Sequence, residues 1–182
     1  RNSVFAVEQP PRLAKVEHAP GQPKSGEAVV ITTVPAVAAD GSEIYAEYQV
    51  VKPGSYVHID DAAYERNWIK LPMNDLGQAG DANAGDGVFS ATVPGGIQQH
   101  RHLIRYRVSV KNALGQVAIA PYPGDPSPNF AYFCYNGVPA WTGSNRVNGK
   151  KETFPSRVME SLPTYHLIAN ATDVTNSQYN SS

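Results

Sequence analysis

The sequence has 182 residues, of which 41% are hydrophobic and 17% carry a charge. The charged share lies below the roughly 25% typical of soluble domains, and the formal net charge is −1. Because lysines and arginines are scattered without a basic block, the long-range attraction to nucleic acid or to an anionic membrane is missing. No apolar run reaches the length of a membrane-spanning helix. We therefore expect no nucleic-acid partner and no membrane insertion, in a chain long enough to bury a core.

Short alternating or β-branched segments, separated by loops rich in Gly, Pro, Asn and Asp, run from residue 11 to residue 136. This pattern is typical of half-buried strands joined by turns. Strands are predicted, in chain order, at residues 13–18, 27–34, 44–51, 56–59, 68–73, 88–94, 103–110, 116–121 and 130–135. One helical turn is expected within 60–66. The sequence thus predicts an all-β fold, an immunoglobulin- or fibronectin-III-like β-sandwich with an extended C-terminal tail.

The composition changes after residue 136. Residues 137–160 contain few apolar side chains and many Gly, Asn, Lys and Pro, as a linker does. A strand-like pattern returns at 161–169. We therefore expect a lead-in at 1–10, the sandwich at 11–136, a linker or docked extension at 137–160, and the truncated start of a following domain at 161–182.

An Asp-rich loop precedes the predicted strand at 88–94. Four of its residues supply the hard oxygen ligands that calcium prefers: Asp75, Asp81, Asn83 and Asp86. Residues 81–85 match the start of an EF-hand loop, but the fifth position is Gly85 and the twelfth is Thr92 rather than a bidentate Glu. Two interpretations stay open: a calcium site, or a turn whose side chains cap their own backbone. Calcium is the one cofactor that the sequence suggests.

Three further patterns have a chemical and a plainly structural interpretation. Residues 143–151 approach a phosphate-binding loop, but five residues separate the glycines and Lys151 replaces the Mg²⁺-binding Ser or Thr, which favours a solvated linker. His100 and His102 would share one face of a strand and could bind a metal, yet no third ligand is evident and a polar loop edge is favoured.

Cys134, the single cysteine, has no disulfide partner and is expected to be a buried structural thiol. Without a nucleophile elbow, we expect no enzyme activity in this chain.

The aromatic residues offer candidates for a ligand or interface surface. Those singled out are Trp68, Trp141, Tyr122 and Tyr165. Core packing accounts for most aromatics of the chain, whereas Trp141 falls in the linker and Tyr165 in the strand-like segment that follows it. Coplanar exposed rings among them would indicate glycan binding.

Five segments in a fixed order carry a family resemblance. They are residues 11–23, 84–89 with the motif Gly-Asp-Gly-Val-Phe, 105–107, 129–141 and 162–167. Together they resemble the module just upstream of the kinase-like domain in large bacterial proteins of the spore-coat-H family. The resemblance spans nearly the whole chain.

The resemblance implies an exported bacterial protein, secreted or at the cell surface, in which this chain is an accessory domain. It implies that the kinase-like domain begins near Leu162 and that its nucleotide and metal residues lie beyond Ser182, so no catalytic residue is carried over. The expected function is a non-catalytic structural or interaction module that positions that neighbouring domain. The alternatives are a carbohydrate-binding module and a calcium-stabilised adhesion module, with a glycan or a cell-surface protein as partner.

Overall fold

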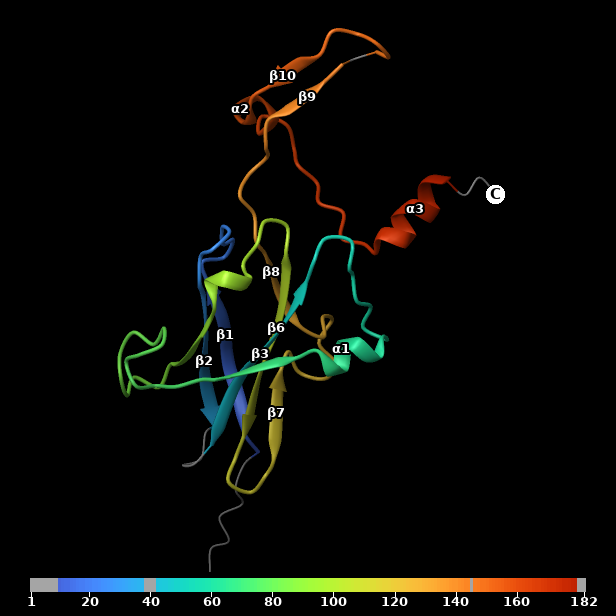
Figure 1. Ribbon diagram of the computed structural model, residues 1–182. Helices are drawn as coiled ribbons and strands as arrows, with labels where there is room; N and C mark the ends of the chain where they lie inside the picture. The colour runs from blue at the N-terminus through green and yellow to red at the C-terminus, as the bar shows by residue number, and fades with distance from the viewer. Residues whose placement is uncertain (1–9, 38–41, 145, 180–182) are drawn as a thin grey trace, which may run out of the picture.

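The computed structural model describes residues 10–37, 42–144 and 146–179, and it is mostly β, with antiparallel sheets and a few short helices (Figure 1). Residues 1–9 of the expected lead-in and 180–182 of the expected following domain lie outside the described residues. The first sheet has three strands in the order β1-β2-β5. Its strands are β1 (Arg12–Ala19), β2 (Val29–Val37) and β5 (Phe89–Val93).

The second sheet has five strands built around β3 and β6, which pair along their whole length. Its strands are β3 (Glu43–Val51), β4 (Ile69–Pro72), β6 (Leu103–Lys111), β7 (Val117–Ala120) and β8 (Phe130–Phe133). β4 extends the sheet beyond β3. On the other side of β6, β7 pairs with residues 108–111 and β8 with residues 103–106. The β-rich prediction is thereby confirmed.

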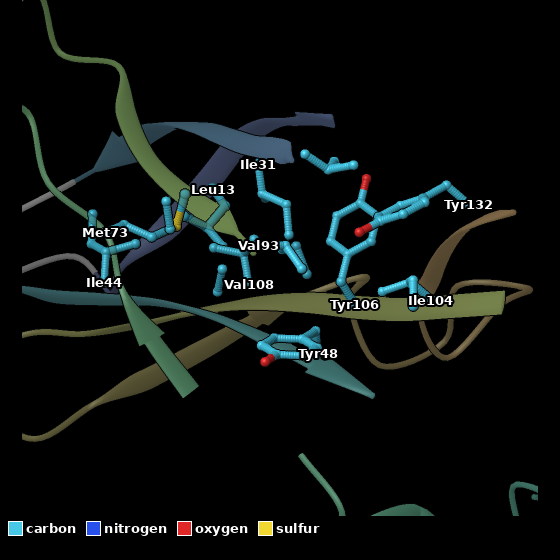
Figure 2. Close-up of a cluster of buried hydrophobic side chains, with 14 of the residues drawn as sticks. Leu13, Ile31, Ile44, Tyr48, Met73, Val93, Ile104, Tyr106, Val108 and Tyr132 are labelled. Carbon is cyan, nitrogen blue, oxygen red and sulfur yellow. The ribbon is translucent and has the colours of Figure 1, made fainter. Parts of the chain in front are cut away.

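Side chains from both sheets meet in one hydrophobic core (Figure 2). Alternate residues of β6, from Ile104 to Val110, belong to this core and are almost fully buried. β2 contributes Ile31, and β5 contributes Val93. Because side chains of a strand point to opposite faces in turn, this burial follows the alternation seen in the sequence.

The second sheet is also covered on the face away from the core, which we call the outer face. Polar side chains on this face of β3 and β6 are buried: Glu47, Gln49, Arg105 and Ser109. The helix α1 (Ala62–Arg66) supplies the buried Tyr64, whose backbone carbonyl accepts a hydrogen bond from Nε2 of Gln49. The helical turn expected within 60–66 is confirmed by α1.

The strand predicted at 56–59 is wrong. These residues form a loop instead, and the carbonyl oxygen of Val57 accepts a hydrogen bond from Nη1 of Arg105 at 2.8 Å. The Arg105 guanidinium also lies 4.9 Å from the ring centroid of Tyr56. The backbone carbonyl of Val57 is therefore hydrogen bonded to the Arg105 side chain of the outer face, rather than to the backbone of a neighbouring strand.

The C-terminal extension leaves the two sheets after residue 136 and forms a hairpin of its own (Figure 1). Its elements are β9 (Trp141–Gly143), β10 (Glu152–Phe154), α2 (Ser156–Met159) and α3 (Ala171–Tyr179). The chain then returns to the body, where Gly54 and Asn170 form a parallel bridge. The backbone N–H of Ala171 donates to the carbonyl of Gly54 at 3.0 Å. The strand expected at 161–169 does not form, because this extended segment has no partner strand among the described residues.

The helices of the described residues are short. Besides α1, α2 and α3 there is one turn of 3-10 helix, η1 (Gly95–Ile97). In the part of the chain that the structure describes, none of the helices has the length and apolar character needed to cross a membrane.

Candidate functional site

The Asp-rich loop connects β4 to β5 and brings three of its four predicted ligands together. One carboxylate oxygen each of Asp75, Asp81 and Asp86 lies within 4.8 Å of the others. Asn83 contacts this cluster through its amide nitrogen, which donates to Oδ2 of Asp86 at 3.4 Å. A set of hard oxygens at this spacing has the chemistry to hold a divalent cation such as Ca²⁺.

The same carboxylates also hold the backbone of their own loop. Asp75 accepts hydrogen bonds from the N–H groups of Gly85 at 2.7 Å, Asp86 at 3.2 Å and Gly87 at 3.0 Å. Asp81 and Asp86 each accept a further backbone N–H. Gly85 and Gly87 have positive φ angles of 76° and 81°, which glycine adopts without steric cost. The three aspartates therefore cap five backbone N–H groups of their own loop.

A row of charges crosses the outer face of the second sheet. The strand register places Lys70 of β4 and Arg107 of β6 directly opposite Glu47 of β3, one on each side. Glu47 accepts a hydrogen bond from Nε of Arg107 at 2.7 Å and from Oγ of Ser109 at 3.1 Å. Arg107 contacts Oε2 of Glu47, whereas Nζ of Lys70 lies 3.2 Å from Oε1 of the same carboxylate. The Glu47 side chain is 3% exposed, so this charged row is anchored by a buried carboxylate.

Burial alone would raise the pKa of Glu47, because a carboxylate loses solvation in the protein interior. The hydrogen bond and the positive charge of Arg107, with further donors from Lys70 and Ser109, outweigh burial and hold the pKa of Glu47 below its ordinary value. Glu47 is therefore ionised at neutral pH and shared between two cations. In this state it joins three strands, whereas a general acid would need a raised pKa.

Trp68, one of the predicted interface residues, packs over the charged row. The guanidinium carbon of Arg107 lies 4.3 Å from its ring centroid, a cation–π contact. Tyr64 meets it edge to face at 5.4 Å. The indole Nε1 is buried and has no hydrogen-bond partner among the described residues. Trp68 thus closes the outer face, and its ring is occupied by neighbours of its own chain.

Tyr122, another predicted interface residue, ties β1 to the turn after β7. Its hydroxyl accepts a hydrogen bond from the N–H of Leu13 at 2.7 Å and donates to the carbonyl of Leu13 at 2.8 Å. Its own N–H donates to Oδ2 of Asp125 at 2.7 Å. The structure therefore gives this side chain a role in joining distant segments.

His100 and His102 do not share a strand face, because both lie in the loop before β6. Nδ1 of His100 accepts a hydrogen bond from the N–H of Asn136 at 3.1 Å. Nδ1 of His102 donates to the carbonyl of Ile97 at 3.1 Å. Cys134 is buried and free, as predicted, and burial raises the pKa of its thiol.

The other two predicted aromatics are exposed, with 50% of Trp141 and 91% of Tyr165 accessible. Trp141 lies opposite Phe154 in the β9–β10 hairpin, and the two rings stack with centroids 5.8 Å apart. Residues 143–151, the segment similar to a phosphate loop, span the connection from β9 to β10. Since a strand rather than a helix follows this segment, the structural context of a phosphate loop is missing.

The described residues define a β-rich protein of antiparallel sheets with an Asp-rich loop, a buried charged row and an exposed aromatic hairpin. In comparisons with known proteins, the chain matches no protein-family model, and no curated protein matches it.

Proposed function

We propose that this chain is a non-catalytic structural module that positions a neighbouring domain of the same polypeptide. The resemblance carried by residues 129–141 and 162–167 supports a kinase-like domain as that neighbour, in an exported bacterial protein of the spore-coat-H type. The ionised, paired state of Glu47 and the capping role of Asp75 support a non-catalytic module, because these acidic groups serve the fold.

Strand order supports an immunoglobulin- or fibronectin-III-like sandwich as the fold of this module. In constant-type immunoglobulin domains, strands A, B and E share one sheet with D, and strands C, F and G form the other. β1, β2 and β5 follow the A-B-E order, and β3, β6 and β7 follow the C-F-G order. β4 departs from the D position, since it pairs with β3.

The observation that carries the proposed function is an apolar strip on the C-terminal extension. It consists of Val158, Leu162, Tyr165, Leu167 and Ile168, each at least 41% exposed. Between them, the ring of His166 packs against Phe133 and Tyr135, with centroids 4.7 Å apart in both cases. The His166 ring thus fixes the strip to the body, while the five apolar side chains stay at least 41% exposed. Large exposed apolar side chains gathered on one short segment indicate an interaction site.

Hydrogen exchange tests this proposal in the 182-residue chain and in the parent polypeptide that includes the neighbouring domain. We expect amides of residues 158–168 to exchange about tenfold or more slowly in the parent, because the neighbour covers them. Amides of residues 113–116, in the turn between β6 and β7, should exchange equally in both. Equal exchange at 158–168 in the two proteins would overturn the proposal.

A matched pair of variants sharpens the test. Leu162 and Leu114 are equally exposed, at 65% and 64%. In the 182-residue chain, Leu162→Ser and Leu114→Ser should each change the free energy of unfolding by no more than about 0.5 kcal/mol. In the parent, only Leu162→Ser should restore fast exchange at 158–168.

A calcium-stabilised adhesion module is the second candidate, favoured by the convergence of Asp75, Asp81 and Asp86. Because each of these carboxylates already accepts a backbone N–H, we expect the loop to be ordered by its own caps. The melting temperature should then agree within about 1 °C in millimolar CaCl₂ and in EDTA. A ligand that binds only the folded state must raise it, so a calcium-dependent rise of several degrees, absent with Mg²⁺, would establish the cation site instead.

A further inference from the structure

The β9–β10 hairpin contains a hollow of about 540 Å³. It is lined by Trp141, Ser144, Arg146, Lys150, Glu152 and Phe154. Small-molecule sites have volumes of roughly 300–1,000 Å³ and combine apolar surface with a few convergent polar groups. The hollow has this size and this mixed lining.

Its aromatic part is held in place by the hairpin. Trp141 and Phe154 are cross-strand neighbours, and Gly143 lies on the same face two residues along. A Cβ atom on Gly143 would come within 2.1 Å of the Trp141 ring, so the indole lies over backbone that only glycine leaves free. On the opposite face, the hydroxyls of Thr142 and Thr153 are hydrogen bonded at 2.8 Å. The hairpin therefore presents a fixed aromatic surface that is half exposed.

Three charged side chains line the hollow. The side chains of Arg146, Lys150 and Glu152 have no hydrogen-bond or ion-pair partner among the described residues. The hydroxyl of Ser144 donates to the backbone carbonyl of Arg146 at 2.9 Å, so this hydrogen bond does not involve the guanidinium. With two cations and one carboxylate, the lining of the hollow carries a net positive charge, which favours an anionic ligand. The charged row on the outer face has the same composition, but there Lys70 and Arg107 are both paired with Glu47.

We propose that this hollow binds an acidic saccharide, meaning a pyranose ring that carries a carboxylate. The C–H face of the ring packs on Trp141, since aromatic side chains provide flat apolar surface. The carboxylate accepts charge-assisted hydrogen bonds from Arg146 and Lys150, and Glu152 accepts from ring hydroxyls. This inference specifies the ligand of the carbohydrate-binding alternative. It uses no residue of the apolar strip, so its failure would leave the hydrogen-exchange result untouched.

Titration calorimetry of the 182-residue chain with tetragalacturonate, a uronic acid oligomer, tests the proposal. We expect binding to tetragalacturonate and at least about tenfold weaker binding to cellotetraose, which has the same ring size without carboxylates. Equal binding of both oligomers, or no binding of tetragalacturonate at millimolar concentration, would overturn the acidic-saccharide assignment. Binding of ATP without binding of tetragalacturonate would indicate a nucleotide site and would also overturn it.

Two lysines give a matched control. Lys150 lines the hollow, whereas its neighbour Lys151 is not among the described residues that line it. We expect Lys150→Gln to weaken tetragalacturonate binding about tenfold and Lys151→Gln to change it less than about twofold. Equal losses would show general charge attraction and would contradict the site. Trp141→Ala should abolish binding, but it also removes the stacking on Phe154, so the lysine pair is the deciding comparison.

Discussion

Replacing Glu47 by glutamine is expected to lower the free energy of unfolding by about 3 kcal/mol. The substitution keeps the size of the side chain and removes its charge. Arg107, whose side chain is only 19% exposed, then loses the carboxylate that accepts its Nε hydrogen bond at 2.7 Å. Leaving one partner of a buried ion pair uncompensated is costly because the remaining charge is poorly solvated. Lys70 is 63% exposed and regains water, so its share of the loss is small.

Urea denaturation of Glu47→Gln and Glu43→Gln measures this difference. Glu43 lies on the same strand, β3, and is exposed. We expect Glu43→Gln to change the free energy of unfolding by no more than about 0.5 kcal/mol, as surface charges do. Similar effects of the two substitutions would contradict the role assigned to the charged row.

Wild type and Glu47→Gln also differ in how their stability depends on pH. The pKa of Glu47 is lower in the folded state than its ordinary value of 4.5, so the unfolded chain binds more protons in the window between the two values. The stability that Glu47 contributes is therefore fully present above about pH 4.5 and is lost as pH falls through the folded pKa. The difference in unfolding free energy between wild type and Glu47→Gln should shrink on acidification below pH 4.5. If the difference in unfolding free energy stays constant down to pH 2, the charge of Glu47 is not what stabilises the sheet.

The strands could be predicted because each carries its own local signal. The alternation at 44–51 and 103–110 marks β3 and β6 to within one residue at either end. β9 and β10 were not predicted, because strands of three residues are too short to show a period. The strand-like pattern at 161–169 predicts a strand that the structure does not contain. Its apolar residues are exposed in the described structure, so the pattern there reflects the apolar strip rather than a sheet face.

The candidate sites also differ in whether a local sequence pattern reveals them. The Asp-rich loop could be found from sequence, because Asp75 and the last N–H that it caps are 12 residues apart. The charged row could not, because Glu47 and Arg107 are 60 residues apart and meet only through the register of β3 against β6. Alternating polar residues in two predicted strands indicate a polar face, yet the partner of each charge depends on a pairing that no local pattern contains.

Replacing Asp75 by alanine is expected to lower the free energy of unfolding by about 2 kcal/mol, because the N–H groups of Asp86 and Gly87 lose their acceptor and that of Gly85 keeps only the backbone carbonyl of residue 75, at 3.3 Å. Water reaches these partly exposed groups and keeps the cost below that of three buried unsatisfied donors. Asp86→Ala is the matched variant in the same loop. It removes the cap on only one backbone N–H, that of Val88, and should cost clearly less. Equal costs in thermal or urea unfolding would contradict the capping interpretation.

Asp86→Asn separates capping from cation binding, because the two roles respond to charge in opposite directions. An asparagine oxygen can still accept the N–H of Val88, so the cap survives. In EDTA, removing one of three carboxylates within 4.8 Å relieves like-charge repulsion. We therefore expect this variant to unfold at the same temperature as wild type or slightly above it. If the loop held Ca²⁺, wild type would gain stability on adding calcium and Asp86→Asn would lose most of that gain, since a charged ligand contributes more than a neutral one. Equal melting temperatures of both proteins with and without calcium would leave capping as the reason that three aspartates converge in this loop.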